Sequence, residues 1–93
     1  MANFTVRVEL HGATEAHYAQ LHSDMEGQGF ARRIQADDGK WYHLPTAEYR
    51  YSANQSASDV CNKAHGIAHR IRPNPAVLTE AGNTSWNGLS VVR

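Results

Sequence analysis

The chain has 93 residues, of which 41% are hydrophobic and 19% are charged. This length leaves room for one hydrophobic core, so we expect residues 1–93 to form a single domain, and the composition argues against wholesale disorder. Nine Lys and Arg residues balance nine Asp and Glu residues, which argues against a protein that coats nucleic acid through bulk positive charge.

The chain begins with the pattern of a strand followed by that of a helix. Residues 4–10 alternate apolar and polar side chains, which predicts a half-buried strand. Thr14 is placed to cap a helix, and Gly27 and Gly29 provide positions where that helix can end. We expect the polar side chains of the strand to lie on the sheet face that no helix covers: Thr5, Arg7 and Glu9.

A hairpin rich in aromatic and charged residues follows. Residues 30–35 and 41–51 read as two strands, and Asp37-Asp38-Gly39 between them is typical of a tight turn, because Asp and Gly tolerate positive φ angles. Pro45 cannot donate a hydrogen bond to a neighbouring strand, so we expect it at a sheet edge, a bulge or a local break.

The second half of the chain starts with another helix. Ser56 or Ser58 can cap it, and Pro73 and Pro75 end it. Its apolar stripe is expected to pack against the first strand and consists of Val60, Ala64, Ile67 and Ile71.

The end of the chain completes the expected fold. Residues 76–80 and 85–92 are predicted as strands that form a hairpin around a turn at 81–84. The element order is then β-α-β-β-α-β, with the last strand doubled as a hairpin. Right-handed crossovers make this order an α+β fold, a ferredoxin-like split β-α-β sandwich, in which an antiparallel sheet carries both helices on one face.

Cysteine usage and hydropathy indicate a compartment. The single cysteine, Cys61, cannot form an internal disulfide, which is typical of a reducing environment. The first residues lack a basic segment followed by an apolar run, and no stretch of about 18 apolar residues occurs. We therefore expect a cytoplasmic protein without a membrane partner.

The hairpin around residues 37–39 carries the densest set of side chains suited to RNA. Guanidinium groups fit phosphates, aromatic rings stack on unpaired bases, and a histidine exchanges protons near neutral pH. The candidate catalytic residues are His43, Arg32 and Asp38. The candidate RNA-binding residues are Arg7, Arg33, Lys40, Trp41 and Tyr42. The alternative is an ordinary solvated hairpin, whose Asp side chains make turn hydrogen bonds and whose Trp packs on the sheet.

Two other features indicate chemistry more weakly. His65 and His69 stand at i and i+4 on the second helix, a spacing that can hold one metal ion, but Gly66 occupies the place of a catalytic Glu and no third ligand is evident. Cys61 borders the apolar stripe and reads as a small core residue. We expect no metal site and no cofactor.

Three segments of the chain resemble one known family. They are FTVRVELHGA at the start, GFARRIQADDGKWYHLPTAEY in the middle and AVLTEAGNTSWNGL near the end. Over residues 4–91 the chain resembles the small endoribonuclease antitoxins of type V toxin–antitoxin systems, the GhoS family, with residues 37–49 as the most specific segment. The resemblance implies a ferredoxin-like domain that cleaves the messenger RNA of a small membrane-lytic toxin.

The expected function is therefore cleavage of single-stranded RNA. This reaction needs a base for the 2′-OH proton, an acid for the 5′-oxygen and positive charge near the phosphorane. His43 would transfer a proton, Arg32 or Arg33 would hold the phosphate, and Asp38 would orient a histidine or bind Mg²⁺. The alternative function is a non-enzymatic module that binds RNA or a protein through the same sheet, with the aromatic strand as the edge of a possible homodimer.

Overall fold

The computed structural model describes residues 1–92, which form two helices and five strands. In chain order the elements are β1 (Ala2–Glu9), α1 (Glu15–Gly27), β2 (Arg33–Gln35), β3 (Trp41–His43), β4 (Glu48–Ala53), α2 (Ala57–His69) and β5 (Ala76–Ala81). Both helices begin at a side-chain cap, because the hydroxyl groups of Thr14 and Ser56 accept hydrogen bonds from backbone N–H groups in the first turn. The predicted cap at Thr14 is confirmed, and Ser56 rather than Ser58 caps α2.

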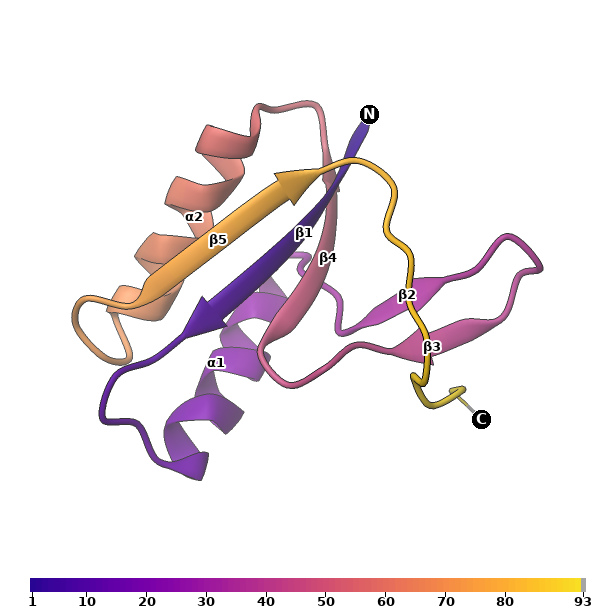
Figure 1. Ribbon diagram of the computed structural model, residues 1–93. Helices are drawn as coiled ribbons and strands as arrows, with labels where there is room; N and C mark the ends of the chain where they lie inside the picture. Colours follow the sequence, from indigo (N-terminus) through magenta and orange to yellow (C-terminus); the bar gives the residue numbers. More distant parts are fainter. Residues whose placement is uncertain (93) are drawn as a thin grey trace.

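A three-stranded antiparallel sheet with the order β4-β1-β5 forms the body of the molecule (Figure 1). Val6 of β1 pairs with Tyr49 of β4 on one side and with Thr79 of β5 on the other. A bridge between Ala31 and Arg50 adds the segment before β2 to the outer edge of β4. The resulting order is consistent with the predicted ferredoxin-like arrangement.

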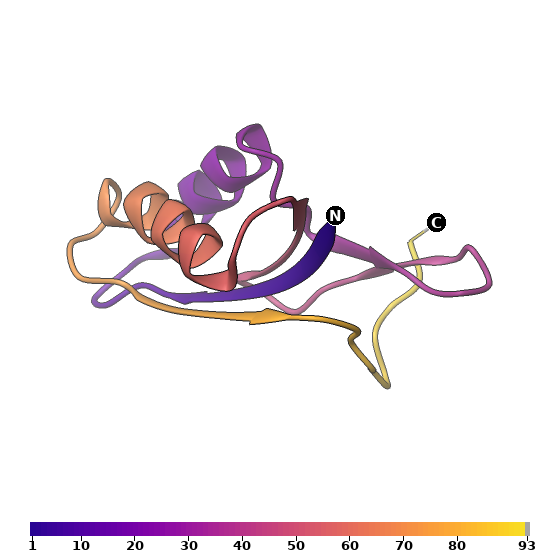
Figure 2. The same cartoon turned by 90° about the horizontal axis from the view of Figure 1, so that it is seen from above.

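Both helices cover one face of this sheet, as predicted (Figure 2). The core between the two layers consists of buried apolar side chains that include Phe4, Val6 and Val8 from β1 and Val60, Ala64 and Ile67 from α2. Burial of one such side chain stabilises the fold by roughly 1.5–3 kcal/mol. Ile71, the last member of the predicted stripe, lies beyond the end of α2 and is only half-buried. Within residues 1–92, neither helix has the length and apolar character that a membrane crossing requires.

The hairpin of β2, β3 and the turn between them extends away from the body, and we call it the hairpin arm (Figures 1 and 2). Its two strands pair in a separate sheet, in which Arg33 is opposite His43 and Gln35 is opposite Trp41. Because side chains alternate along a strand, these four residues share one face of the arm.

The predicted strand over residues 41–51 is broken in the middle. β3 ends at His43 and β4 begins at Glu48. Pro45 has no N–H to donate, and Ala47 has a φ of 64°, which lies outside the strand region. The chain therefore turns between the arm and the body, and of the three positions expected for Pro45, the local break is observed.

The predicted hairpin between residues 76–80 and 85–92 is wrong. After β5 the chain leaves the sheet, and residues 82–92, here called the C-terminal segment, run to the hairpin arm, where Val91 forms a bridge with Tyr42. Arg50 accounts for this path, because its guanidinium donates hydrogen bonds to Gly82 O and Thr84 Oγ1 and so holds the segment near β4. Farther along, the Trp86 ring packs against that of Tyr42, with 5.6 Å between the ring centroids.

Candidate nucleic-acid interface

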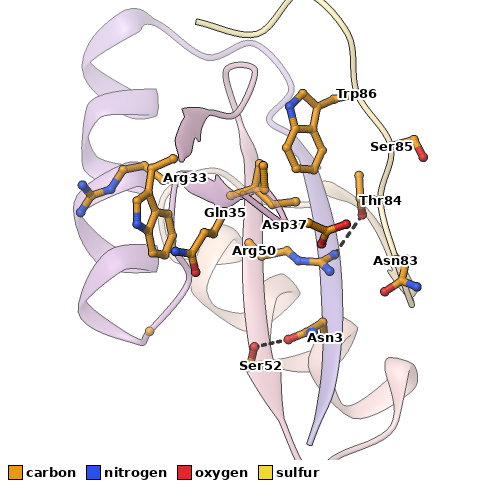
Figure 3. A pocket seen from close by; sticks show the side chains of 15 residues that line it. Asn3, Arg33, Gln35, Asp37, Arg50, Ser52, Asn83, Thr84, Ser85 and Trp86 are labelled. Carbon is orange, nitrogen blue, oxygen red and sulfur yellow. Dashed lines mark hydrogen bonds between the residues drawn. The ribbon is translucent and has the colours of Figure 1, made fainter. Parts of the chain in front are cut away.

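A broad groove of about 920 Å³ lies where the hairpin arm, the helix-free face of the sheet and the C-terminal segment meet (Figure 3). Alternation along β1 brings polar side chains to this face, because Val6 and Val8 are buried on the helix side while Thr5 is half-buried and Arg7 and Glu9 are exposed. This part of the sequence-based prediction is confirmed. The floor of the groove consists of neutral polar residues around one arginine: Asn3, Arg50, Ser52, Asn83 and Thr84.

Arg50 supplies the positive charge of this floor. Its guanidinium donates hydrogen bonds to Thr5 Oγ1 at 2.7 Å, to Thr84 Oγ1 at 3.0 Å and to Gly82 O at 3.1 Å. Burial lowers its pKa, but a guanidinium stays protonated in proteins. None of the ion pairs within residues 1–92 includes Arg50. Its charge therefore has no ion-pair partner there, so it can attract an anion such as phosphate, although the carboxylate of Asp37 also lines the groove.

Two tryptophan rings border the groove. Trp41 of β3 is 44% exposed, and the guanidinium of Arg33 lies over its ring with Cζ 5.9 Å from the centroid. Trp86 enters from the C-terminal segment and is half-buried (Figure 3). Aromatic faces beside cations are suited to unpaired nucleobases, which stack on the rings while the phosphates stay near the positive charge.

A smaller hollow of about 380 Å³ lies beside the groove. It is lined by residues from α1, the hairpin arm and the chain end: Glu26, Arg32, Arg33, His43, Leu44 and Val92. Arg33 lines both the groove and the hollow, so the two depressions are neighbours at this residue.

Arg32 lies close to a polar pair in the protein interior. His22 Nδ1 and Tyr49 Oη are 2.7 Å apart. Burial and the nearby charge of Arg32 lower the pKa of His22, whereas burial raises the pKa of Tyr49 well above its ordinary value. The Nε of Arg32 is itself buried and has no hydrogen-bond partner within residues 1–92. Burial keeps this nitrogen from a ligand in the hollow, which Arg32 lines with other atoms.

The structure brings several predicted site residues together and separates one from them. His43 and Arg32 both line the hollow, and Arg33 and Trp41 line the groove. Asp38 lines neither depression. It lies in the turn of the hairpin arm, where its Oδ1 accepts a hydrogen bond from the backbone N–H of Lys40 at 2.9 Å. This contact is the turn role that the sequence offered as the alternative.

The remaining predicted RNA-binding residues are dispersed. Lys40 is exposed in the hairpin arm, directly before β3, and does not line the groove. Tyr42 lies on the opposite face of the arm from Trp41 and packs against Trp86, so it supports a wall of the groove. Arg7 is on the helix-free face but does not line the groove, and its Nη2 lies 3.7 Å from Glu48 Oε1.

Sequence reasoning missed Arg50, Trp86 and Glu26. Arg50 could have been found from the alternation of β4, which places it on the opposite face from its neighbours Tyr49 and Tyr51. Trp86 and Glu26 had no comparable signal, because each reaches the site through a tertiary contact of a distant segment.

The two histidines of α2 have a local role. Their rings stack with 5.7 Å between centroids, and the Nδ1 of His69 accepts a hydrogen bond from the backbone N–H of Asn74 at 3.2 Å. In the part of the chain that the structure describes, no three His, Cys, Asp or Glu side chains are grouped closely enough to hold a metal ion.

Comparisons with protein-family models, with curated proteins and with solved structures find no match for this chain. The assignment to the GhoS family is therefore an expectation that rests on the sequence segments quoted above.

Proposed function

We propose that this protein is a small endoribonuclease of ferredoxin-like fold that binds single-stranded RNA at the hairpin arm and cleaves it there. The observation that carries this proposal is the position of Arg33, which lines both the groove with its two tryptophan rings and the hollow that contains His43 and Arg32. A strand of RNA that follows the groove past Arg33 would meet an imidazole and a second guanidinium.

The groove supplies the binding part of this function. Bases would stack on Trp41 and Trp86, a contact worth about 1–3 kcal/mol per base. Phosphates would lie near Arg33 and Arg50. A paired base presents only its edge within a duplex, so stacking on these rings favours unpaired RNA over duplex RNA.

The hollow supplies groups for the chemical step. The 2′-oxygen attacks the adjacent phosphorus, the bond from phosphorus to the 5′-oxygen breaks, and the products are a 2′,3′-cyclic phosphate and a 5′-hydroxyl. His43 is exposed and transfers a proton in this reaction. Arg32 and Arg33 stabilise the additional negative charge of the phosphorane.

The resemblance to the antitoxin family supports a specific substrate within this proposal. It favours the messenger RNA of a small toxin as the RNA that is cleaved, and the cytoplasm as the place of action. A toxin gene next to the gene for this protein would support both statements.

An end-labelled AU-rich RNA tests the proposal directly. The purified protein is incubated with this RNA with and without EDTA, alongside the variants His43→Ala and Trp41→Ala. We expect cleavage in both buffers, strong loss of cleavage with normal RNA affinity for His43→Ala, and loss of affinity for Trp41→Ala. Cleavage only without EDTA would instead support a metal-dependent reaction.

The second candidate function is a non-enzymatic RNA-binding module. The observation that favours it is that His43 does not line the groove, so the stacking and phosphate contacts are complete without it. Binding of the RNA that is never followed by cleavage, with affinity lost in Trp41→Ala, would select this function.

A further inference from the structure

The hollow is lined by an acidic residue as well as by the basic ones. Glu26 of α1 lines it together with Arg32, Arg33 and His43. RNA cleavage by attack of the 2′-oxygen requires one group that accepts a proton and one that donates a proton. His43 can fill only one of these places in a single turnover, so a second group is needed. Among the described residues 1–92 that line the hollow, Glu26 alone has a carboxylate side chain.

The fold explains how Glu26 comes to face residues of the arm. It lies in the last turn of α1, where its carbonyl oxygen accepts a hydrogen bond from Gly29 N at 3.1 Å. Gly29 has a φ of 90°, a conformation that glycine adopts without strain, and it turns the chain from the helix toward β2. The helix end and the start of the hairpin arm are thereby held on two sides of one hollow.

Glu26 and the two arginines share this hollow without being paired. The ion pairs within residues 1–92 join Arg7 to Glu48 and His11 to Glu9, and none includes Glu26, Arg32 or Arg33. Glu26 is exposed, so its side chain is accessible to a ligand. Glu26 and the two arginines line one hollow and form no ion pair within residues 1–92, so the hollow suits a ligand that has both an acidic proton and a negative charge. A ribose 2′-OH beside its phosphate has both.

We propose that Glu26 is the general base of the reaction and His43 its general acid, with Arg32 and Arg33 on the phosphate. This inference rests on the proposed ribonuclease function. Glu26 takes the 2′-OH proton as the 2′-oxygen bonds to phosphorus. Protonated His43 gives its proton to the 5′-oxygen as that oxygen leaves. Glu26 ends protonated and His43 neutral, and exchange with solvent restores both.

The charged and titratable groups around Glu26 come from three elements. On α1 itself His22 lies one turn earlier, Tyr49 of β4 is hydrogen-bonded to His22, and the arm contributes Arg32, Arg33 and His43. A pH profile alone would therefore mix several titrations. The test instead uses a substrate whose cleavage requires the group that accepts a proton but not the group that donates one.

The separating probe is a short RNA with one 5′-bridging phosphorothiolate, in which sulfur replaces the leaving oxygen. A thiolate leaves without being protonated, so the general acid becomes unnecessary while the base is still required. Single-turnover cleavage of this RNA and of the ordinary RNA is measured for the wild type, Glu26→Gln, His43→Ala and Glu15→Gln. Glu15 is an exposed glutamate at the other end of α1 and serves as the matched control. Circular dichroism verifies that each variant is folded.

We expect Glu26→Gln to cleave both RNAs about 10²–10⁴-fold more slowly than the wild type, and His43→Ala to be equally slow on ordinary RNA but close to the wild-type rate on the phosphorothiolate. Glu15→Gln should match the wild type. Wild-type cleavage by folded Glu26→Gln, or rescue of Glu26→Gln instead of His43→Ala, overturns the assignment and leaves the ribonuclease function in place. A wild-type protein that cleaves neither RNA overturns the ribonuclease function, and this inference with it.

Discussion

At the scale of single residues, the hydrogen bond between His22 and Tyr49 links stability to pH on the acid side. Burial and the charge of Arg32 lower the pKa of His22 below its ordinary value of 6.5. At pH values between the lowered pKa of folded His22 and 6.5, the unfolded chain binds a proton at this residue that the folded chain does not bind. The free energy of unfolding therefore falls as the pH is lowered through this range. We expect urea denaturation between pH 8 and pH 5 to show this loss, with a smaller slope in His22→Gln. The control His65→Gln changes an exposed histidine and should keep the wild-type slope.

Tyr49 makes the free energy of unfolding fall as the pH rises in the alkaline range. Burial raises its pKa above the ordinary value of 10.0, so the stability that its neutral hydroxyl provides is present below pH 10 and is lost as the pH rises further. Tyr49→Phe should therefore lose less stability than the wild type between pH 9 and pH 11. At neutral pH the same variant should be less stable by about 0.5–1.5 kcal/mol, because it lacks the hydrogen bond to His22. A wild type and variant with parallel curves above pH 9 would contradict the burial argument.

The positions of some candidate site residues could be predicted from the sequence, and the positions of others could not. His43, Arg33 and Trp41 could be assigned to one face from the alternation of a single strand pair, and the structure places them so. Glu26 could not, because no local pattern in the sequence places the end of α1 and His43 at one hollow. Asp38 shows the converse error: an acid near a histidine in sequence was given a catalytic role, although a turn places its carboxylate on its own backbone.

At the scale of elements, two glycines show how position decides the effect of the same substitution. Gly66 lies within α2, has no positive φ, and an added Cβ would meet no atom within 4 Å. Gly66→Ala should raise the free energy of unfolding by about 1 kcal/mol, because alanine favours the helix. Gly29 has a φ of 90°, so Gly29→Ala should destabilise the protein by about 1 kcal/mol or more through backbone strain. Thermal denaturation of the two variants should show Tm shifts of opposite sign.

The packing of α2 on the sheet contributes to the core of the body. Ile67 is 7% exposed and belongs to the core cluster with β1. Ile67→Ala should lower the free energy of unfolding by about 2–5 kcal/mol, through lost burial and the cavity left behind. Ile71→Ala removes the same atoms from a half-buried side chain and should cost clearly less. Equal losses in the two variants, measured by urea denaturation, would show that this stripe does not pack as described.

Elements with a strong local pattern were predictable, and those defined by distant contacts were not. The alternation of β1, the N-terminal caps of both helices and the stripe of α2 are properties of short segments, and the structure contains all of them except Ile71, the last residue of the predicted stripe. The C-terminal segment has a strand-like sequence, but it pairs with β3 instead of folding back on β5. Its path is decided by Arg50, which binds Gly82 O and Thr84, and by the bridge from Val91 to Tyr42. Local sequence contains no information on either contact.

At the scale of the whole molecule, zero net charge and a local surface for RNA are compatible. The nine basic and nine acidic residues cancel, yet Arg33 and Arg50 both line the groove, together with Asp37. Lys40 is exposed in the hairpin arm. Electrostatic attraction acts over about 8 Å at physiological ionic strength, so the local arrangement of charges affects RNA binding more than the net charge does. We therefore expect moderate RNA affinity with few phosphate contacts and a shallow dependence on salt.

The contribution of single residues of the hairpin arm to the salt dependence of RNA affinity can be measured. Each cation that contacts a phosphate of single-stranded RNA releases counterions and steepens the slope of log affinity against log salt by about 0.7. Arg33→Ala and Lys40→Ala should each flatten the slope by about this amount and weaken binding to all RNA sequences alike. Arg72→Ala is the matched control, because Arg72 lies far from the groove and donates to His11 O beside Gly12. Fluorescence anisotropy with a labelled RNA over a series of salt concentrations gives these slopes. If neither arm variant changes the slope, the hairpin arm is not the surface that holds RNA, and the binding site must be sought elsewhere on the molecule.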